Sequence, residues 1–193
     1  MKTSTATIEQ FIFRRLLEMA GTTGQERVLD IHFGTYRASR VLLELLPDAT
    51  VLGLGVHDPE HESEPAVLDV WKFERPPVSH PRFEEVGGDA SSFDVSDGGI
   101  DLVVLGFGIH ELHTAEEKAQ LVCEIHRVLS PNGKVVLFER GHSPWLALVF
   151  GPLFLHFTPA KEWDDWLRQH FNEVERSLVF AMVDLFSASS PRD

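Results

Sequence analysis

The feature that most constrains this chain is the alternation of short apolar runs with amphipathic helical stretches along its first 140 residues. Residues 27–31, 50–55 and 100–105 are apolar-rich runs with the length of a buried strand. A helical pattern over residues 38–46 separates the first two runs. Strand, helix and strand in this order form a parallel βαβ unit, whose sheet is covered by helices on both faces. The sequence therefore predicts an α/β fold with a mostly parallel sheet.

The remaining elements continue this pattern until the chain nears its end. The N-terminal segment, residues 1–24, contains a predicted helix over residues 7–19. We expect this helix to pack on the core through the stripe Ile8, Phe11, Ile12, Leu16 and Met19. Further helices and strands are predicted at residues 65–73, 82–86, 134–138 and 159–171. The closing runs, 173–180 and 182–187, lie so close together that they predict an antiparallel hairpin at the edge of the sheet.

A capping box is predicted where the run 100–105 gives way to the next helix. Thr114 and Glu117 have the spacing at which each side chain satisfies the other's backbone N–H. Cys123, the only cysteine, lies inside this helix, and we expect it to be a buried, inert thiol. The apolar face of the helix is predicted to be Leu121, Val122, Ile125, Val128 and Leu129.

Composition narrows the function classes that suit this chain. The formal charge of −13 repels phosphate backbones, and the longest basic cluster is Arg14-Arg15, so we expect no nucleic-acid partner. The longest apolar run, residues 145–157, is interrupted by Gly151 and Pro152 and is shorter than the roughly 20 residues that cross a bilayer. No export signal is visible at the N-terminus. We therefore expect a cytoplasmic protein without a membrane segment.

The stretches 93–112 and 117–139, including Ile100 to Leu105 and Ser130-Pro-Asn-Gly133, carry a family resemblance. They resemble the fourth strand, the following helix and the fifth strand of the class I S-adenosylmethionine-dependent methyltransferases that act on small molecules. The resemblance implies a Rossmann-like, doubly wound, mostly parallel seven-stranded sheet with helices on both faces and an antiparallel C-terminal hairpin strand. It also implies one domain over residues 1–193, S-adenosylmethionine as cofactor and a small-molecule methyl acceptor.

The loop after the first strand departs from the pattern of that family. The family has an acid near the strand end and then three glycines at alternating positions, which let the backbone approach the methionine part of the cofactor. Asp30 and Gly34 match the acid and the middle glycine. His32 and Tyr36 replace the other two glycines. The resemblance implies that all four residues line the cofactor crevice.

Other cofactor-binding segments match the family in part. Gly55 stands where the second strand of the family ends in an acid that binds the ribose, and Asp58 and Glu60 in the following loop are candidate substitutes. The segment 88–90 matches the family, in which the carboxylate of Asp89 holds the adenine amino group. The predicted cofactor-binding residues are therefore Asp30, His32, Gly34, Tyr36, Gly55, Asp89, Ala90 and Phe107.

These departures leave two interpretations open. In one, the pocket holds S-adenosylmethionine in an altered pose and the protein is a methyltransferase. In the other, His32 and Tyr36 fill the methionine site, and the protein is a histidine-lined enzyme of different chemistry or a binding partner. The space around Gly34 distinguishes the two interpretations.

His110 is the candidate catalytic residue. It follows the fourth predicted strand, and an imidazole titrates near neutrality, which suits the removal of a proton from a methyl acceptor. The alternative is a histidine that simply packs in its loop with a satisfied hydrogen bond. A metal site formed by His32, His57, His110 and Glu111 is a further alternative. No compact ligand motif is present, so we expect no metal.

The aromatic-rich segment 144–158 follows the strand 134–138. Trp145, Phe150, Phe154 and Phe157 are expected to wall an apolar acceptor pocket, with the Gly151-Pro152 break allowing the segment to act as a lid. The acceptor would then be small and hydrophobic. The alternatives are a cover for one face of the sheet and a homodimer contact.

Overall fold

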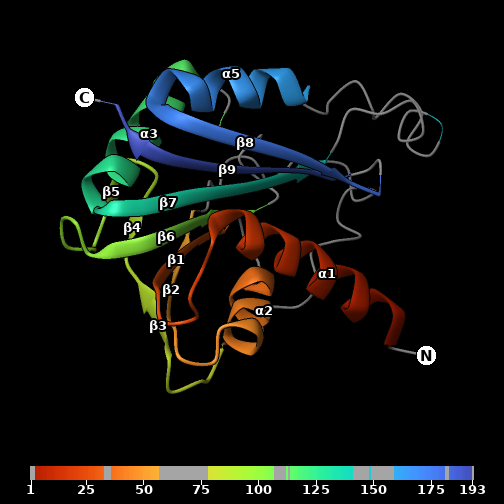
Figure 1. The fold of residues 1–193 in the computed structure, drawn as a ribbon. Helices are drawn as coiled ribbons and strands as arrows, with labels where there is room; N and C mark the ends of the chain where they lie inside the picture. The colour runs from red at the N-terminus through yellow and green to blue at the C-terminus, as the bar shows by residue number, and fades with distance from the viewer. Residues whose placement is uncertain are drawn as a thin grey trace.

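The computed structural model describes residues 3–32, 36–56, 78–106, 112, 114–140, 148, 159–180 and 183–192, with the side chains of 3–7 and 37 excepted. A seven-stranded sheet crosses the molecule in the order β3-β2-β1-β6-β7-β9-β8 (Figure 1). Its strands are β1 (Arg27–His32), β2 (Thr50–Gly55), β3 (Phe83–Val86), β6 (Ile100–Leu105), β7 (Leu129–Arg140), β8 (Phe171–Val179) and β9 (Val183–Pro191). The helices are α1 (Thr3–Ala20), α2 (Arg37–Leu45), α3 (Ala115–Val128) and α5 (Ala160–His170).

The sheet is mostly parallel, as predicted. Strands β1, β2, β3, β6 and β7 pair in parallel, and β9 pairs antiparallel with both β7 and β8. The final hairpin therefore inserts its second strand between the parallel part of the sheet and the edge strand β8. The run 100–105 forms the central strand of the seven, in agreement with its near-continuous apolar sequence. The predicted Rossmann-like, doubly wound fold is confirmed.

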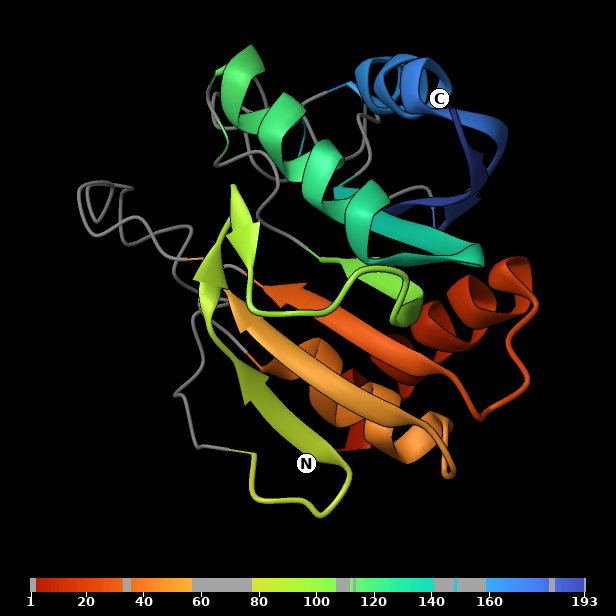
Figure 2. The ribbon, with the colours of Figure 1, turned by 90° about the vertical axis from the view of Figure 1, so that its left-hand side faces the viewer.

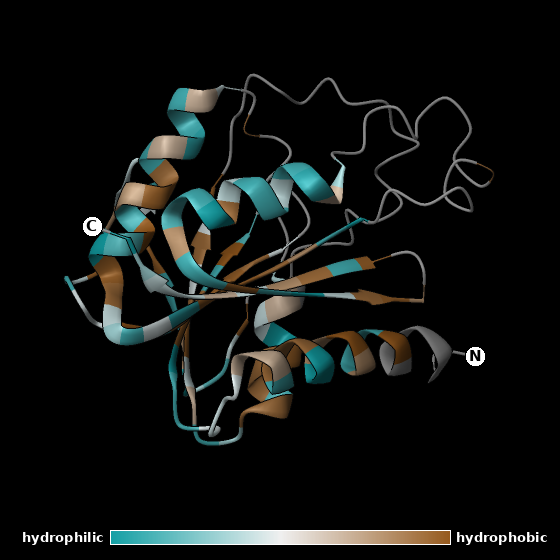
Figure 3. Ribbon diagram, turned by 45° about the horizontal axis from the view of Figure 1, so that its top comes forward, coloured by the Kyte–Doolittle hydropathy of each residue, from teal (hydrophilic) through white to brown (hydrophobic). Residues whose placement is uncertain are grey.

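Helices cover both faces of the sheet because side chains of each strand alternate between the faces. Leu29, Ile31 and Leu105 belong to one buried cluster, which α3 and α5 complete with residues such as Ile125 and Trp163. A second cluster buries the alternate strand residues, including Val28, Val51 and Val104, against α1 and α2. Figure 3 shows apolar residues concentrated along the strands between these two helical layers. At about 25 cal/mol per Å² of apolar area removed from water, both layers contribute strongly to stability.

The N-terminal helix packs on the core, but through a different stripe from the predicted one. Ile12 and Leu16 are buried, whereas Ile8 and Phe11 remain 48% and 52% exposed. The fully buried side of α1 instead includes Phe13 and Leu17. Phe13 packs edge-on against Phe138 of β7, with ring centroids 4.9 Å apart. The prediction failed because apolar residues occur on two sides of the helix, and contact with the sheet selects one of them.

Cys123 is exposed, which contradicts the prediction of a buried thiol. Its neighbours Leu121, Val122 and Ile125 are buried as predicted. Residue 123 lies one position after Val122, and each helical step turns the side chain by about 100°. Its side chain therefore leaves the apolar face on which those neighbours lie.

Two local features were not predicted. A small antiparallel sheet joins β4 (Gly88–Asp89) to β5 (Ser92–Phe93) just after β3 (Figure 2). Strand β7 begins at Leu129 rather than at residue 134, and its pairing with β6 shifts register between the Ile100 and Leu102 pairs.

No helix among the described residues is long and apolar enough to cross a membrane. The predicted helix 65–73 lies outside the described residues, as does the segment 144–158 apart from Leu148.

Candidate functional site

The predicted site lies where the strand order of the sheet reverses. Strand β1 has β2 on one side and β6 on the other, and all three run in the same direction. Their carboxyl ends therefore meet at one edge, where His32 pairs with Gly55 and Ile31 pairs with Leu105. In open α/β sheets such a reversal opens a crevice above the carboxyl ends of the strands. The sequence and the structure thus point to the same edge.

Asp30 is held inside this edge, with none of its surface exposed. The hydroxyl of Ser39, in the first turns of α2, donates a hydrogen bond of 2.5 Å to Asp30 Oδ2. Burial raises the pKa of Asp30 to about 7, because the charged form loses its hydration, and the hydrogen bonds from Ser39 act in the opposite direction. Among the described residues no group donates to the buried Oδ1 atom.

His32 and Gly55 form the last pair of the β1–β2 ladder. His32 is buried, and its imidazole lies over the α-carbon of Gly55. A Cβ atom at residue 55 would lie 3.3 Å from His32 Cε1, which is tighter than most real Cβ contacts. Residues 32 and 55, which both differ from the family pattern, are therefore neighbours in the structure.

Tyr36, at the N-terminal end of α2, packs its ring beside the imidazole of His32 and toward β3. Its ring lies 4.4 Å from that of His32 and packs edge-on against Phe83, at 5.7 Å between centroids. Its hydroxyl donates a hydrogen bond to Glu85. Phe83 in turn packs on Gly53, where an added Cβ would come within 2.7 Å of the ring. The Tyr36 side chain thus packs over β2 and β3.

Asp89 ends β4 of the small β4–β5 sheet, next to β2, and Ala90 lies in the turn between β4 and β5. The carboxylate of Asp89 is exposed and accepts hydrogen bonds of 2.7 Å from both the backbone N–H and the hydroxyl of Ser91. These hydrogen bonds lower the pKa of Asp89, so the group carries its charge at neutral pH. Ala90 is half-buried and packs against the core.

The segment that carries Asp89 is fixed by an ion pair on α3. Arg127 donates to the carbonyl oxygens of Phe93 and Val95 at 2.9 and 2.7 Å, and to Glu124 at 2.7 Å. Glu124 accepts a hydrogen bond of 2.8 Å from the backbone N–H of Phe93. Hydrogen bonding by Arg127 lowers the pKa of Glu124. A planar guanidinium satisfies all these acceptors at once, which an ammonium group cannot do.

Several predicted residues lie outside the part of the chain that the structure describes. These are Gly34 and Phe107 of the predicted cofactor site, the candidate base His110, and the alternative groups His57, Asp58, Glu60 and Glu111. Within the described residues no group of three or more potential ligands is arranged to hold a metal ion.

Sequence reasoning missed the residues that support the predicted site. Ser39 could have been found, because it lies in the first turn of the helix predicted at residues 38–46, which follows the strand that carries Asp30. Nothing in the sequence links Phe83 or Glu85 to Tyr36, since they come from a strand more than 40 residues away. The pairing of β2 with β3 brings them together.

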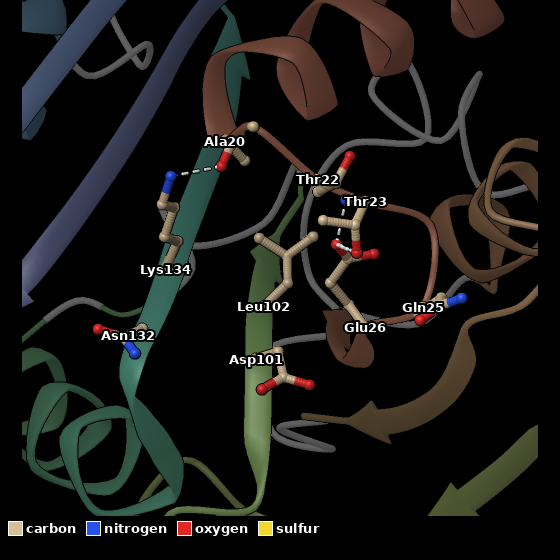
Figure 4. A pocket seen from close by; sticks show the side chains of 10 residues that line it. Ala20, Thr22, Thr23, Gln25, Glu26, Asp101, Leu102, Asn132 and Lys134 are labelled. Carbon is tan, nitrogen blue, oxygen red and sulfur yellow. Dashed lines mark hydrogen bonds between the residues drawn. The ribbon is translucent and has the colours of Figure 1, made fainter.

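A separate pocket of about 230 Å³ lies at the opposite, amino edge of the sheet, between the end of α1 and the first residues of β1, β6 and β7 (Figure 4). Its charged groups already have partners. Lys134 donates to the carbonyl oxygen of Ala20 at 2.6 Å, and Asp101 accepts from the backbone of Arg27 at 3.0 Å. Glu26 accepts hydrogen bonds from Thr23 and Gly24. These contacts close the connection between α1 and β1, and this pocket does not coincide with the predicted cofactor site.

Comparison with known proteins agrees with this geometry. A family profile described as a methyltransferase domain matches residues 29–137, more than half of the chain. The chain belongs to the class I S-adenosylmethionine-dependent methyltransferase family. The profile spans β1 to β7 and so covers the predicted cofactor site.

Individual members of this family are distant relatives. The demethylmenaquinone methyltransferase of Renibacterium salmoninarum is 26% identical over 145 residues, which are 75% of this chain and 52% of that protein. The chain thus spans about half the length of the curated relatives it matches.

Solved structures share the fold at low identity. A S-adenosylmethionine-dependent methyltransferase from Aquifex aeolicus aligns with a TM-score of 0.66 at 17% identity, covering 91% of this chain and 87% of that one. The 1,6-didemethyltoxoflavin-N1-methyltransferase of Burkholderia thailandensis was solved with bound 1,6-didemethyltoxoflavin and S-adenosylhomocysteine. It aligns with a TM-score of 0.62 at 20% identity, covering 92% of this chain and 75% of that one. At these identities the likeness establishes the fold.

Proposed function

We propose that this protein transfers a methyl group from S-adenosylmethionine to a small, hydrophobic molecule. The observation that carries the proposal is the pair of acids at family positions on one edge of the sheet. Asp30 is buried with no donor to its Oδ1 atom among the described residues, and Asp89 is exposed and charged. The family match over residues 29–137 supports the same function.

The residues fit such a cofactor in chemical terms. When bound, S-adenosylmethionine supplies a methyl group that is already activated on a sulfonium. We assign the methionine part to Asp30 and Gly34 and the adenine amino group to Asp89, which accepts hydrogen bonds in its charged form. Ala90 and Phe107 would line the adenine side. His32, Tyr36 and Gly55 would line the same crevice.

The chain's own contribution to chemistry is then alignment and proton removal. Holding the acceptor in line with the methyl group lowers the entropic part of the barrier. We assign proton removal to an imidazole nitrogen of His110, which would take the proton from an oxygen, nitrogen or carbon acceptor as its bond to the methyl group forms. No metal is needed for this reaction.

The rival interpretation, a cleft plugged by Tyr36, has less support. The Tyr36 ring packs between His32 and Phe83, and its hydroxyl bonds to Glu85 on β3. This side chain therefore has a structural role on the sheet, which accounts for it without a loss of cofactor binding.

The acceptor class follows from the sequence of the 144–158 segment and from the relatives. That segment would form an aromatic wall, which suits a flat, apolar acceptor. Because the curated relatives are named for demethylmenaquinone, a quinone of that class is the first acceptor to test. We further propose a cytoplasmic protein, a domain over residues 1–193 and a homodimer without nucleic-acid partners.

Calorimetry with S-adenosylmethionine and S-adenosylhomocysteine tests the cofactor assignment. We expect saturable binding with a dissociation constant in the micromolar range, and at least tenfold weaker binding by Asp89→Ala. An Asp48→Ala variant, changed at an exposed acid in the turn between α2 and β2, serves as the control. Absence of binding at millimolar ligand would overturn the proposal. Transfer of a labelled methyl group to demethylmenaquinone, abolished by His110→Ala, then tests the chemistry.

A further inference from the structure

A row of aromatic rings lies between α3 and α5, the two helices that cover the same face of the sheet (Figure 1). Trp166 contacts Trp163 and His170, with ring centroids 6.2 and 5.8 Å apart. His126 of α3 continues the row, at 6.2 Å from His170 and 5.0 Å from Phe171. All four contacts are edge-on, and the two imidazoles meet where α3 lies against the end of α5.

The packing suits a neutral imidazole at residue 126. The Nε2 atom of His126 is buried and has no hydrogen-bond partner among the described residues. A neutral imidazole has one nitrogen without a proton, whereas both nitrogens of a protonated imidazole are donors. A buried N–H without an acceptor has lost its water and has gained no hydrogen bond. Protonation of His126 is therefore unfavourable while the two helices remain packed.

The charged groups on the neighbouring elements have partners of their own. On α3, Glu124 and Arg127 form an ion pair at 2.7 Å. On α5, Arg168 pairs with Asp164 at 2.7 Å. Arg192, which follows β9, donates to backbone carbonyl oxygens at the junction of α5 with β8. The acids in this set are thus already paired with arginines.

The two imidazoles oppose each other's protonation. Burial, and then the positive charge of His170, lower the pKa of His126, and a hydrogen bond with the backbone of His170 acts in the opposite direction. Burial also lowers the pKa of His170. Because His170 ends α5, where the helix dipole favours a cation, we expect the first proton on His170 and the second, less readily, on His126.

We propose that His126 and His170 form a pH-sensitive junction, which holds α3 against α5 while one imidazole is neutral and loosens when both are protonated. The second proton places two like charges in one interface, and His126 Nε2 regains water only if the helices separate. This inference goes beyond the proposed function and does not depend on the cofactor.

The direction of the pH dependence follows from the two lowered pKa values. The folded protein takes up these protons less readily than the unfolded chain does. The stabilisation is therefore fully present above the ordinary histidine pKa of 6.5 and is lost as the pH falls below it.

Thermal unfolding at pH 8 and at about pH 5.5 tests the junction with His126→Gln, His170→Gln and the double variant. Relative to wild type, the melting temperature of each single variant should rise by about 2 to 4 °C between pH 8 and the lower pH. The double variant should gain less than the sum of both, because either change already removes the pair of charges. Comparison with wild type cancels the contribution of Asp30, which all four proteins share.

Two controls separate the junction from general effects of pH. His80→Gln changes a half-buried histidine before β3, and its difference from wild type should be the same at both pH values. Acrylamide quenching of tryptophan fluorescence, measured well below the melting temperature, should increase on acidification in wild type but not in His126→Gln. Trp166→Phe should abolish that increase, because the Trp166 ring contacts His170.

The outcomes decide the proposal. A difference between wild type and both single variants that stays constant from pH 8 to the lower pH would overturn it. Gains that add fully in the double variant would also overturn it, because the two rings would then titrate independently. If His126→Gln does not fold, the less deeply buried His170→Gln decides by the same comparison. A gain in both single variants with a smaller-than-additive double variant would support the junction.

Discussion

Asp30 is a buried acid whose ionisation opposes folding. Its pKa is raised from 3.8 to about 7 by burial, so the folded protein holds a proton there that the unfolded chain releases above pH 4. The contribution of Asp30 to stability is therefore fully present below pH 3.8 and is lost as the pH rises toward 7. A positively charged ligand near Oδ1 would favour release of this proton.

Asp30→Asn is expected to remove this pH dependence while keeping the shape of the side chain. Between pH 5 and pH 8 the free energy of unfolding of the variant should rise relative to wild type by on the order of 3 kcal/mol, and level off above pH 7. Urea unfolding at several pH values measures the difference. Asp48→Asn, at an exposed position, is the control. A constant difference between variant and wild type across this range would contradict the raised pKa.

At the scale of elements, the ends of the helices depend on side chains from outside each helix. The last turn of α2 leaves carbonyl groups without intrahelical partners. Arg82, just before β3, donates to the carbonyl oxygens of Leu43, Leu46 and Ala49 at 2.7 to 2.8 Å. This guanidinium joins α2 to the edge strand β3 and so supports the β2–β3 region on which Tyr36 packs.

Removal of that cap should loosen α2. Arg82→Ala is expected to lower the free energy of unfolding by about 1 to 3 kcal/mol, because buried carbonyl groups lose a charged donor. Arg82→Lys retains the charge without the planar fork, so its free energy of unfolding should lie between those of Arg82→Ala and wild type. Chemical denaturation gives the comparison. Equal stability of Arg82→Ala and wild type would show that water replaces the guanidinium at no cost.

The capping box of α3 allows a second test at this scale. Thr114 Oγ1 accepts a hydrogen bond of 3.1 Å from Glu117 N, and the Glu117 carboxylate accepts one of 2.8 Å from Thr114 N. Thr114→Ala should cost about 1 kcal/mol, whereas Thr114→Ser should be close to wild type. Unfolding monitored by circular dichroism measures both. A serine variant as unstable as the alanine variant would indicate that the methyl group, rather than the cap, stabilises this end.

For the whole molecule, α1 closes one face of the sheet and links its two halves. Its buried residues contact α2, β7 and β9, and Lys134 of β7 bonds to the carbonyl oxygen of Ala20 at its end. The parallel half and the C-terminal hairpin therefore share one helical cover. We expect the two halves to unfold together.

Leu16→Ala should destabilise the whole protein by about 2 to 5 kcal/mol, because Leu16 is fully buried between helix and sheet. Fluorescence and circular dichroism should report the same transition for both halves. The matched variant Ile8→Ala, at a half-exposed position of the same helix, should cost less than about 1 kcal/mol. A larger effect at Ile8 than at Leu16 would contradict the burial of Leu16 and the exposure of Ile8.

Much of the fold could be predicted from local pattern. The apolar runs at 50–55 and 100–105 became strands with the predicted bounds, and the Thr114–Glu117 spacing became a capping box. The position of Asp30 at the carboxyl edge followed from the same pattern. These predictions succeeded because each depends on residues close together in the sequence, where periodicity and hydrogen-bond geometry act directly.

The sequence by itself determined the α/β class, the parallel order of the first strands and the closing hairpin. It also indicated that Asp30 lies near the carboxyl end of the first strand. Only the tertiary structure decided which side of α1 is buried and that Tyr36 reaches Glu85. It also decided that His32 lies over Gly55. The reason is that pairing between strands, rather than order along the chain, sets which side chains share space across a sheet.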